Sequence, residues 1–318
     1  MTRTFQTSPA VRGNVPLLLA LIGPSGGGKT YSALRLATGI QRVETGPIYV
    51  VDTEANRALA YADEFRFVHV PFVAPFGSLD YLDCFQQCVK EGARTIIVDS
   101  MSHEHEGPGG VLDQAEEYII AKLRRKNLDR ESDEGWREEQ KLKRSAWIEP
   151  KRDRTKLVQG MVQMSCNFIL CFRAKEGTDQ RRNGGKTEIV KLGWVPIGGD
   201  AFWYEMTARA LLPPGANGVP TWSTELEGEK IAIRRPKQFE PILTGQLNED
   251  MGQRMAEWAS GGVKLDLDAA LAKLAACSTS QELRAQAGAL RTQAWTAEQR
   301  NTIAQTIATR QAELKPKE

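Results

Sequence analysis

The sequence has no apolar stretch long enough to cross a membrane, no closely spaced cysteine pair of the metal-binding kind, and no strong charge imbalance. None of its apolar stretches reaches the roughly 18 residues of a membrane-spanning helix, so we expect no membrane partner. Its five cysteines (84, 88, 166, 171 and 277) lack a C-x-x-C pair, which predicts reduced thiols in a cytosol. Because the net charge is only +2, an argument for nucleic acid must rest on local charge.

Residues 1–14 are polar and contain no apolar core of the kind found in secretory signals. We expect them to form a flexible N-terminal arm, and we expect the protein to be cytoplasmic. The remaining composition, with 41% apolar and 26% charged residues, is ordinary for a globular protein.

A glycine-rich segment matches the phosphate-binding pattern G-x-x-x-x-G-K-[ST]: Gly23, Pro24, Ser25, Gly26, Gly27, Gly28, Lys29 and Thr30. An apolar stretch over 15–22 predicts a strand before it, and 31–37 predicts the opening of a helix after it, which is the context that the motif requires. In such loops the backbone N–H groups and the helix N-terminus hold phosphate oxygens. The segment, together with Tyr31, therefore predicts a site for ATP and Mg²⁺; a glycine-rich turn without a ligand is the alternative.

Three side chains have predicted roles at this site. Lys29 would reach the β- and γ-phosphates, and the Thr30 hydroxyl would ligate Mg²⁺. Asp99, which ends an apolar strand over 95–99 that we expect beside the loop strand, would hold the same Mg²⁺ through water.

Hydrolysis also needs a group that orients water toward the γ-phosphate. Glu54, shortly after an apolar strand over 48–51, is our candidate, since ligands of open α/β sheets bind at the carboxyl edge. Asp52, Glu104 and Glu106 are rivals for this role. A merely solvated Glu54 that caps the strand is the alternative.

Strand and helix patterns alternate along the first two thirds of the chain. Strands are expected over 15–22, 48–51, 65–70, 95–99 and 167–172, and helices over 31–40, 78–91, 111–123 and 155–164. Residues 173–187 are polar and predict a mobile loop or hairpin tip, and short strands are expected over 189–192, 208–212 and 230–233, before a helix near 249–259. This order predicts an α/β fold with a mostly parallel central sheet flanked by helices.

The chain after Gly261-Gly262 differs from what precedes it. It is rich in Ala, Gln and Leu, and we expect helices over about 267–276, 280–292 and 296–314, with capping boxes at 279–282 and 296–299. We therefore divide the chain into the arm 1–14, a large domain 15–262 and a small helical module 263–318.

Two of these segments resemble bacterial RecA proteins. Residues 48–55 (IYVVDTEA) are similar to the segment that carries the RecA catalytic glutamate, and 96–100 (IIVDS) are similar to its Walker B strand. The resemblance implies a RecA-like P-loop NTPase in which Glu54 is catalytic. It also implies that the strand 167–172 ends in a polar γ-phosphate sensor followed by a DNA-binding loop. Arg173 occupies the sensor position, where RecA proteins have Gln.

Three further segments resemble a group of RecA-like ATPases of phages and prophages, usually encoded beside recombination and single-strand annealing genes. They are 99–104 (DSMSHE), 150–158 (PKRDRTKLV) and 193–197 (GWVPI), the last followed by Asp200 and 204–205. The resemblance covers about 15–260. It implies a phage- or prophage-encoded ATPase of the bacterial cytoplasm that acts in recombination, single-strand annealing or replication. It further implies a ring or filament of identical subunits, DNA-stimulated ATP hydrolysis, and a phage recombination or replication protein as partner of 263–318.

Local positive charge marks two segments as DNA contacts. Residues 121–156 hold 13 Lys and Arg against 8 Asp and Glu, and a second basic segment covers 173–191. Such contacts to single-stranded DNA bind phosphates, and exposed aromatics add stacking, for which Trp136, Trp147 and Trp194 are available. The candidates for phosphate contact are Lys151, Arg152, Arg154, Lys175, Arg181, Arg182 and Lys186. Solvated charge on a helix over 121–145, and on the loop 175–187, is the alternative.

Other functions remain open at this stage. A nucleotide or small-molecule kinase would use the same loop, with 121–156 as its lid, and a nucleotide-binding adaptor would bind ATP without turnover. Arg234 or Arg235 would complete the site of a neighbouring subunit in an oligomer, or would form a surface salt bridge.

Overall fold

The structure is a computed structural model that describes residues 13, 15–183, 186–261, 267–291 and 297–314. Residue contacts divide the chain into two compact units, one over Pro16–Ala256 and one that contains the C-terminal helices. The expected arm over 1–14 falls, except for Gly13 alone, outside the described residues.

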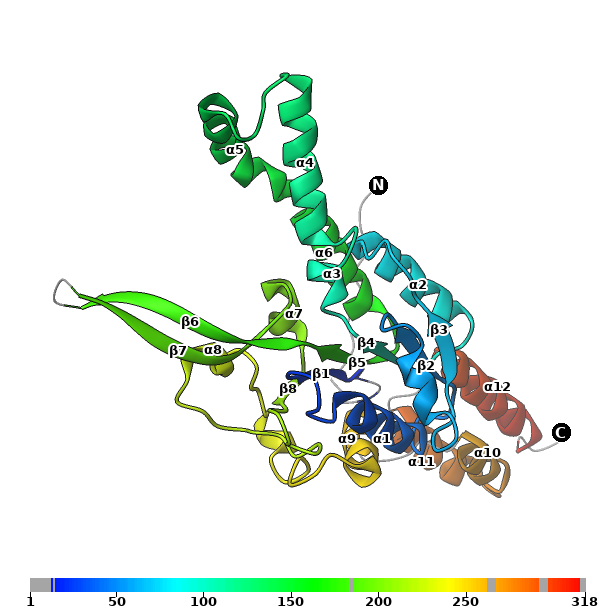
Figure 1. Ribbon diagram of the computed structural model, residues 1–318. Coiled ribbons are helices and arrows are strands. Elements are labelled where there is room, and N and C mark those ends of the chain that lie inside the picture. Colours follow the sequence, from blue (N-terminus) through cyan, green and yellow to red (C-terminus); the bar gives the residue numbers. More distant parts are fainter. Residues whose placement is uncertain (1–12, 14, 184–185, 262–266, 292–296, 315–318) are drawn as a thin grey trace. The chain divides into compact units, whose positions relative to one another are not determined.

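The larger unit is built on a six-stranded sheet in the order β3–β2–β4–β5–β1–β8 (Figure 1). All five strand pairings are parallel, which confirms the predicted α/β architecture with a parallel central sheet. The strands are β1 (Leu18–Ile22), β2 (Ile48–Asp52), β3 (Val68–Pro71), β4 (Thr95–Asp99), β5 (Asn167–Phe172) and β8 (Ala208–Leu211).

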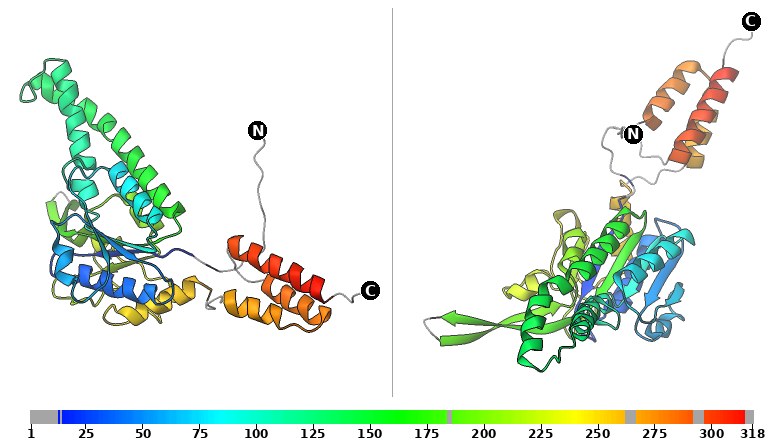
Figure 2. Two further views of the ribbon diagram at one scale, coloured as in Figure 1. Left: turned by 90° about the vertical axis from the view of Figure 1, so that its right-hand side faces the viewer. Right: turned by 90° about the horizontal axis from the view of Figure 1, so that it is seen from above.

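Helices cover both faces of this sheet (Figure 2). On one face lie α2 (Ser78–Lys90), α6 (Ile148–Gln163) and α7 (Asp200–Glu205), whose apolar side chains share a core with alternate strand residues. The largest side chains of that core include Tyr81, Phe85, Phe168, Phe172 and Phe202, all fully buried. Because both faces are covered, the inner strands are buried along their whole length and are mostly apolar, as parallel strands usually are.

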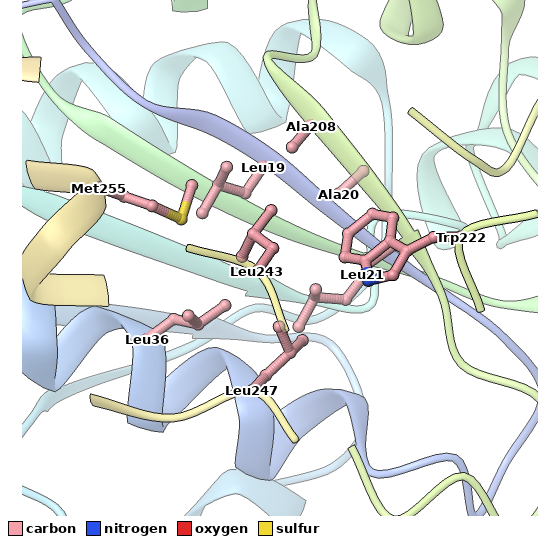
Figure 3. A pocket seen from close by; sticks show the side chains of 10 residues that line it. Leu19, Ala20, Leu21, Leu36, Ala208, Trp222, Leu243, Leu247 and Met255 are labelled. Carbon is pink, nitrogen blue, oxygen red and sulfur yellow. The ribbon is translucent and has the colours of Figure 1, made fainter. Parts of the chain in front are cut away.

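On the opposite face lie α1 (Lys29–Gln41) and α9 (Glu249–Ala259). Figure 3 shows the side chains between β1, β8 and the segment 222–255, which include Leu21, Trp222 and Met255. They leave a cavity of only about 10 Å³, which is room for about one water and not for a ligand. This region between the sheet and the segment 222–255 is therefore a packed apolar core.

Two slender elements extend from the larger unit (Figure 1). One is a helical arm of α4 (Val111–Arg125) and α5 (Asp133–Ala146), with a small apolar cluster of its own. The other is an antiparallel hairpin of β6 (Ala174–Asn183) and β7 (Lys186–Pro196). Of the two predictions for 173–187, a mobile loop or a hairpin tip, the structure has the hairpin: 174–183 pairs with 186–196, with one register shift between Gly177 and Thr178.

The predicted strand over 230–233 is wrong. The chain forms a short helix, α8 (Glu227–Lys230), and pairs with the sheet only through a single bridge between Arg209 and Arg234. Ile231 and Ile233 favour a strand, but they and the buried Ala232 pack against the apolar core without strand pairing. The remaining short elements are η1 (Arg57–Tyr61), α3 (His103–Glu106) and η2 (Lys237–Phe239).

The C-terminal unit consists of α10 (Leu267–Ala275), α11 (Ser280–Arg291) and α12 (Ala297–Glu313). These three helices enclose a separate apolar cluster that includes Leu274, Leu283 and Ile303. The predicted capping box is present: the Glu282 N–H donates to Thr279 Oγ1 (3.2 Å), and the Thr279 N–H donates to the Glu282 carboxylate (3.3 Å). The second box, at 296–299, and the linker at Gly262 lie partly or wholly outside the described residues.

No helix in the described part of the chain is both long and apolar enough to span a membrane. All five cysteines are free thiols, and four of them are buried.

Candidate functional site

The carboxyl edge of the sheet brings the predicted site residues to one level. The register pairs Asp52 with Asp99, Asp99 with Cys171, and Cys171 with Leu21. The loops that follow β1, β2, β4 and β5 therefore start side by side. This is the edge at which ligands of parallel α/β sheets bind.

The glycine-rich loop joins β1 to the first turn of α1. Gly26 and Gly28 have left-handed backbones (φ +83° and +85°), which favour glycine, and the loop tip at Ser25 and Gly26 is exposed. The Lys29 ammonium donates to the carbonyl oxygens of Gly23 (2.9 Å) and Pro24 (2.8 Å). The first turn of α1 directs its unpaired N–H groups to the same place, so the loop can hold an anion.

Close packing explains, independently of any ligand, why two positions of the loop, Gly23 and Gly27, are glycine. A Cβ at Gly23 or Gly27 would lie 2.0 Å or 2.5 Å from the carbonyl oxygen of Leu212, at the end of β8. A Cβ at Gly26, in contrast, would meet nothing within 4 Å. The close approach of β8 therefore explains two glycines without any ligand, whereas the open tip and the Lys29 contacts need another explanation.

Thr30 and Asp99 are in direct contact across this edge, because the Thr30 hydroxyl donates to Asp99 Oδ2. Burial raises the pKa of Asp99, while this hydrogen bond and the Lys29 charge act against the rise. A hydroxyl and a carboxylate are the oxygen ligands that Mg²⁺ uses beside phosphates and waters. Among the described residues no group of three or more His, Cys, Asp or Glu could hold a metal ion.

The strand order corrects one expectation about Asp99. We expected its strand beside the loop strand, but β5 lies between β4 and β1. Asp99 is nevertheless in contact with Thr30, because the hydrogen bond between their side chains passes over the end of β5. Arg173 is the residue that follows this intervening strand.

Glu54 lies in the turn after β2, and Arg173 binds it. Nε and Nη2 of Arg173 both donate to Glu54 Oε1, at 3.0 and 2.6 Å, and Arg57 contacts Oε2 at 3.2 Å. Burial of Glu54 opposes its ionisation, but the hydrogen bonds and charge of Arg173 outweigh burial and hold the pKa of this carboxyl below its ordinary value. Glu54 is therefore a half-buried carboxylate paired with a cation.

Of the three rival acids, Asp52 and Glu104 have structural partners. Asp52 accepts hydrogen bonds from the backbone N–H groups of Glu54 (2.8 Å) and Ala58 (2.9 Å), so it shapes the turn that presents Glu54. Glu106 lies on α3, with its carboxylate 3.9 Å from Arg173 Nη1, and is partly exposed. Glu104 is fully buried in an ion pair with Arg154, so Glu54 and Glu106 are the candidates for the water-orienting role whose cations are partly exposed.

Sequence reasoning missed a set of contacts in which Ser100 and His103, shortly after Asp99, bind Thr53. His103 Nδ1 lies 2.7 Å from Thr53 Oγ1, next to Glu54, and burial followed by the Arg173 charge lowers the pKa of His103, so the ring is neutral at pH 7. Thr53 in turn accepts from the Ser100 N–H at 2.8 Å. The nearness of these residues to Asp99 and Glu54 in the sequence was the one signal that could have pointed to them.

Glu104, the residue after His103, forms a buried ion pair with Arg154. Arg154 donates to both carboxylate oxygens of Glu104 (2.8–3.1 Å), to which the Ser78 hydroxyl also donates at 2.5 Å. The two side chains are 0% and 7% exposed. This burial removes Glu104 from the acids that could orient water, and it removes Arg154 from the proposed DNA contacts.

A double-mutant cycle tests this structural role. Arg154→Met leaves the Glu104 carboxylate buried without its cation, so we expect it to lower the free energy of unfolding by about 3–5 kcal/mol. Adding Glu104→Leu should restore most of that loss, because the pair is then replaced by apolar groups. Urea unfolding of the variants measures both values. An Arg154→Met protein of normal stability that binds DNA weakly would instead return Arg154 to the DNA contacts.

The other predicted residues on helices have local partners. The Tyr31 hydroxyl donates to Glu64, and its ring packs edge-on against Phe65 (5.3 Å), so it lies beside the loop with its polar group engaged. Lys151 stands over the Trp147 ring (5.6 Å). The exposed Arg152 pairs with Glu149 at 3.2 Å.

The hairpin presents its basic residues on two different faces. Arg181 pairs with Asp179 (3.2 Å) and with Glu227, so acids partly neutralise one face. Since side chains alternate along strands, the register places Arg182 and Lys191 together on the other face, both exposed. Lys175 is exposed at the base of β6, and the Lys186 side chain lies outside the described part of the structure.

Arg234 and Arg235 both have partners within the chain. Arg234 donates to the Met206 carbonyl (3.0 Å), and Arg235 donates to the Leu243 carbonyl (3.2 Å) and stacks on Trp222. These contacts give each arginine a role in the fold, whatever else it does.

No protein-family model matches this chain, and no curated protein matches it in sequence.

Proposed function

We propose that this protein is a RecA-like P-loop ATPase that binds ATP and Mg²⁺ at the loop 23–30. The observation that carries the proposal is the geometry around that loop: an exposed tip at a helix N-terminus, Lys29 across it, and Thr30 in contact with Asp99. A triphosphate bound there would take up the Lys29 ammonium and the first-turn N–H groups. Mg²⁺ would join its β- and γ-oxygens to Thr30 and, through water, to Asp99.

We attribute hydrolysis to Glu54. The register pairs Asp52 with Asp99 and Asp99 with Cys171, and Glu54 and Arg173 follow β2 and β5 at this same edge of the sheet. In this proposal Glu54 orients a water toward the γ-phosphate, and Arg173, at the end of β5, meets the phosphate itself. ATP, Mg²⁺ and the four residues Lys29, Glu54, Asp99 and Arg173 would make up the reacting centre.

We infer further that single-stranded DNA is the polymer on which this ATPase acts. The hairpin starts at the residue after Arg173, and its free face combines Arg182 and Lys191 with Ile189, which is 70% exposed. On α5, Trp136 is 59% exposed and offers a stacking surface, whereas Trp147 and Trp194 are half-buried. The resemblance to phage RecA-like proteins makes recombination, single-strand annealing or replication the expected process.

The hairpin contacts can be tested by salt dependence. Arg182→Ala combined with Lys191→Ala should reduce the slope of log K against log salt for oligo-dT by about 1.4, or about 0.7 for each lost phosphate contact. Fluorescence anisotropy at several salt concentrations measures the slope. Arg66→Ala, a similar change at an exposed site away from the hairpin, should leave it unchanged. An unaltered slope in the double variant would remove the hairpin from the DNA surface.

One experiment separates the ATPase from the other functions. Phosphate release from ATP is measured with and without oligo-dT, and phosphoryl transfer to added nucleoside monophosphates is measured in parallel. DNA-stimulated release supports the proposal, and phosphoryl transfer would indicate a kinase with residues 121–156 as its lid. Tight ATP binding without turnover under any condition would indicate an adaptor.

The remaining parts of the proposal concern assembly and origin. We propose a ring or filament of identical subunits, encoded by a phage or prophage and working in the bacterial cytoplasm. The C-terminal helices α10–α12 would bind a phage recombination or replication protein. Sedimentation with and without ATP and DNA tests the assembly.

A further inference from the structure

We propose that the ion pair between Arg173 and Glu54 is a latch that keeps the ATPase slow until the β6–β7 hairpin is engaged. This inference rests on the proposed function and describes how that same site is regulated. Arg173 acts here through Glu54, so it is a positioning residue in the resting state as well as a phosphate contact.

The contacts of Glu54 show what the latch does. Both hydrogen bonds from Arg173 end on Oε1, whereas the contact at Oε2 is with Arg57, which is exposed and therefore weakens the carboxylate little. His103 and Asp99 also interact with this carboxylate through their charge. A carboxylate bound in this way is a weak acceptor for a water proton, because its negative charge is already shared with the guanidinium. Arg173 must therefore leave before Glu54 can orient water well.

The backbone of Arg173 is part of the base of the hairpin. Its carbonyl accepts from the Ile197 N–H (2.8 Å), and its N–H donates to Ser102 Oγ (2.8 Å), whose hydroxyl donates to the Ile197 carbonyl (2.7 Å). The two chain ends of the hairpin, before Ala174 and after Pro196, are thus fastened to each other. A ligand that shifts the hairpin would shift Arg173 with it.

The same base also touches the glycine-rich loop. The Ala174 N–H donates to the Gly23 carbonyl (3.2 Å), which also accepts from the Lys29 ammonium. A triphosphate that recruits Lys29 would loosen this corner, and its γ-oxygens would compete with Glu54 for the Arg173 guanidinium. Nucleotide and DNA would therefore open the latch together, which accounts for DNA-stimulated turnover.

The variant Arg173→Gln tests the latch, because a latch and a pure phosphate sensor predict opposite signs. We expect its turnover without DNA to rise about tenfold or more, the effect of losing a charge-assisted hydrogen bond, and we expect DNA to add little more. Arg173→Lys, which keeps the charge but not the paired N–H groups, should lie between Arg173→Gln and the wild type. A fall in DNA-free turnover, or an unchanged stimulation by DNA, would overturn the proposal.

A matched control and a pH profile make the result specific. Arg57→Gln removes the other cation at the same carboxylate, but Arg57 is 76% exposed and is not part of the hairpin base, so turnover should stay within about twofold. Without Arg173 the pKa of Glu54 rises, so the acid limb of the turnover profile should move to higher pH in Arg173→Gln and remain in place in Arg57→Gln. An acid limb that does not move would overturn the latch. Loss of nucleotide binding in Lys29→Ala is measured separately and tests the proposed function alone.

Discussion

Lys29→Ala should abolish ATP binding at the concentrations at which the wild-type protein is saturated. The ammonium lies across the glycine-rich loop, within 2.9 Å of two loop carbonyls, and a triphosphate would replace those carbonyls as its partner. Loss of one to two charge-assisted hydrogen bonds corresponds to a decrease in affinity of about 10²-fold or more. Isothermal titration calorimetry with a slowly hydrolysed ATP analogue and Mg²⁺ measures this directly.

The control for this experiment is Lys90→Ala, at the exposed C-terminal end of α2, which removes the same charge from the opposite end of a helix. Its affinity should equal that of the wild type. Thermal unfolding of both variants should be normal, because Lys29 is partly exposed and contacts only its own loop. Full affinity in a folded Lys29→Ala protein would contradict the nucleotide site, and with it every role assigned to Glu54 and Arg173.

The features that could be predicted from the sequence are those fixed by local pattern. The buried strands β1, β2, β4 and β5 follow apolar runs, α2 follows apolar spacing, and the loop 23–30 follows a motif in which each residue type has its own conformational or chemical reason. The predicted capping box at 279–282 depends on residues only three apart. Such features need no knowledge of distant parts of the chain.

Features that depend on distant parts of the chain were predicted less well. The insertion of β5 between β4 and β1 depends on how the helices cover the sheet, and no strand sequence contains that information. For 174–196 a hairpin tip over 173–187 and a strand over 189–192 were predicted, but not the length of the two strands, which are stabilised by pairing with each other and by packing against α8. In both cases the missing information lies in contacts with other parts of the chain.

The candidate site shows the same division. Lys29, Thr30, Glu54 and Asp99 were proposed from the sequence, and the structure places them at one edge of the sheet. The burial of Arg154 could not be foreseen, because its charged neighbours 151–156 are typical of an exposed helix and its partner Glu104 is 50 residues away. The same holds for the contact between Arg173 and Glu54, which are 119 residues apart.

Glu54→Gln should leave ATP binding intact and lower turnover by about 10²–10⁴-fold, the usual contribution of a general base or water-orienting carboxylate. The amide keeps the shape of the side chain and one acceptor oxygen, and Asp52 continues to hold the turn through the backbone of Glu54 and Ala58. The loss should therefore appear in kcat rather than in nucleotide affinity. Steady-state phosphate release and calorimetry on the same preparation separate the two quantities.

Two further variants make this result decisive. Glu106→Gln changes the other partly exposed acid near Arg173, at 3.9 Å, and should alter turnover by less than about threefold, the effect of a weak surface pair. If Glu106→Gln, and not Glu54→Gln, is the inactive variant, the water-orienting role belongs to α3. In the combination of Glu54→Gln with Arg173→Gln, turnover should remain as low as in Glu54→Gln alone, because opening a latch has no effect when the carboxylate that it holds is absent. Activation that persists in the double variant would show that Arg173 restrains some other group.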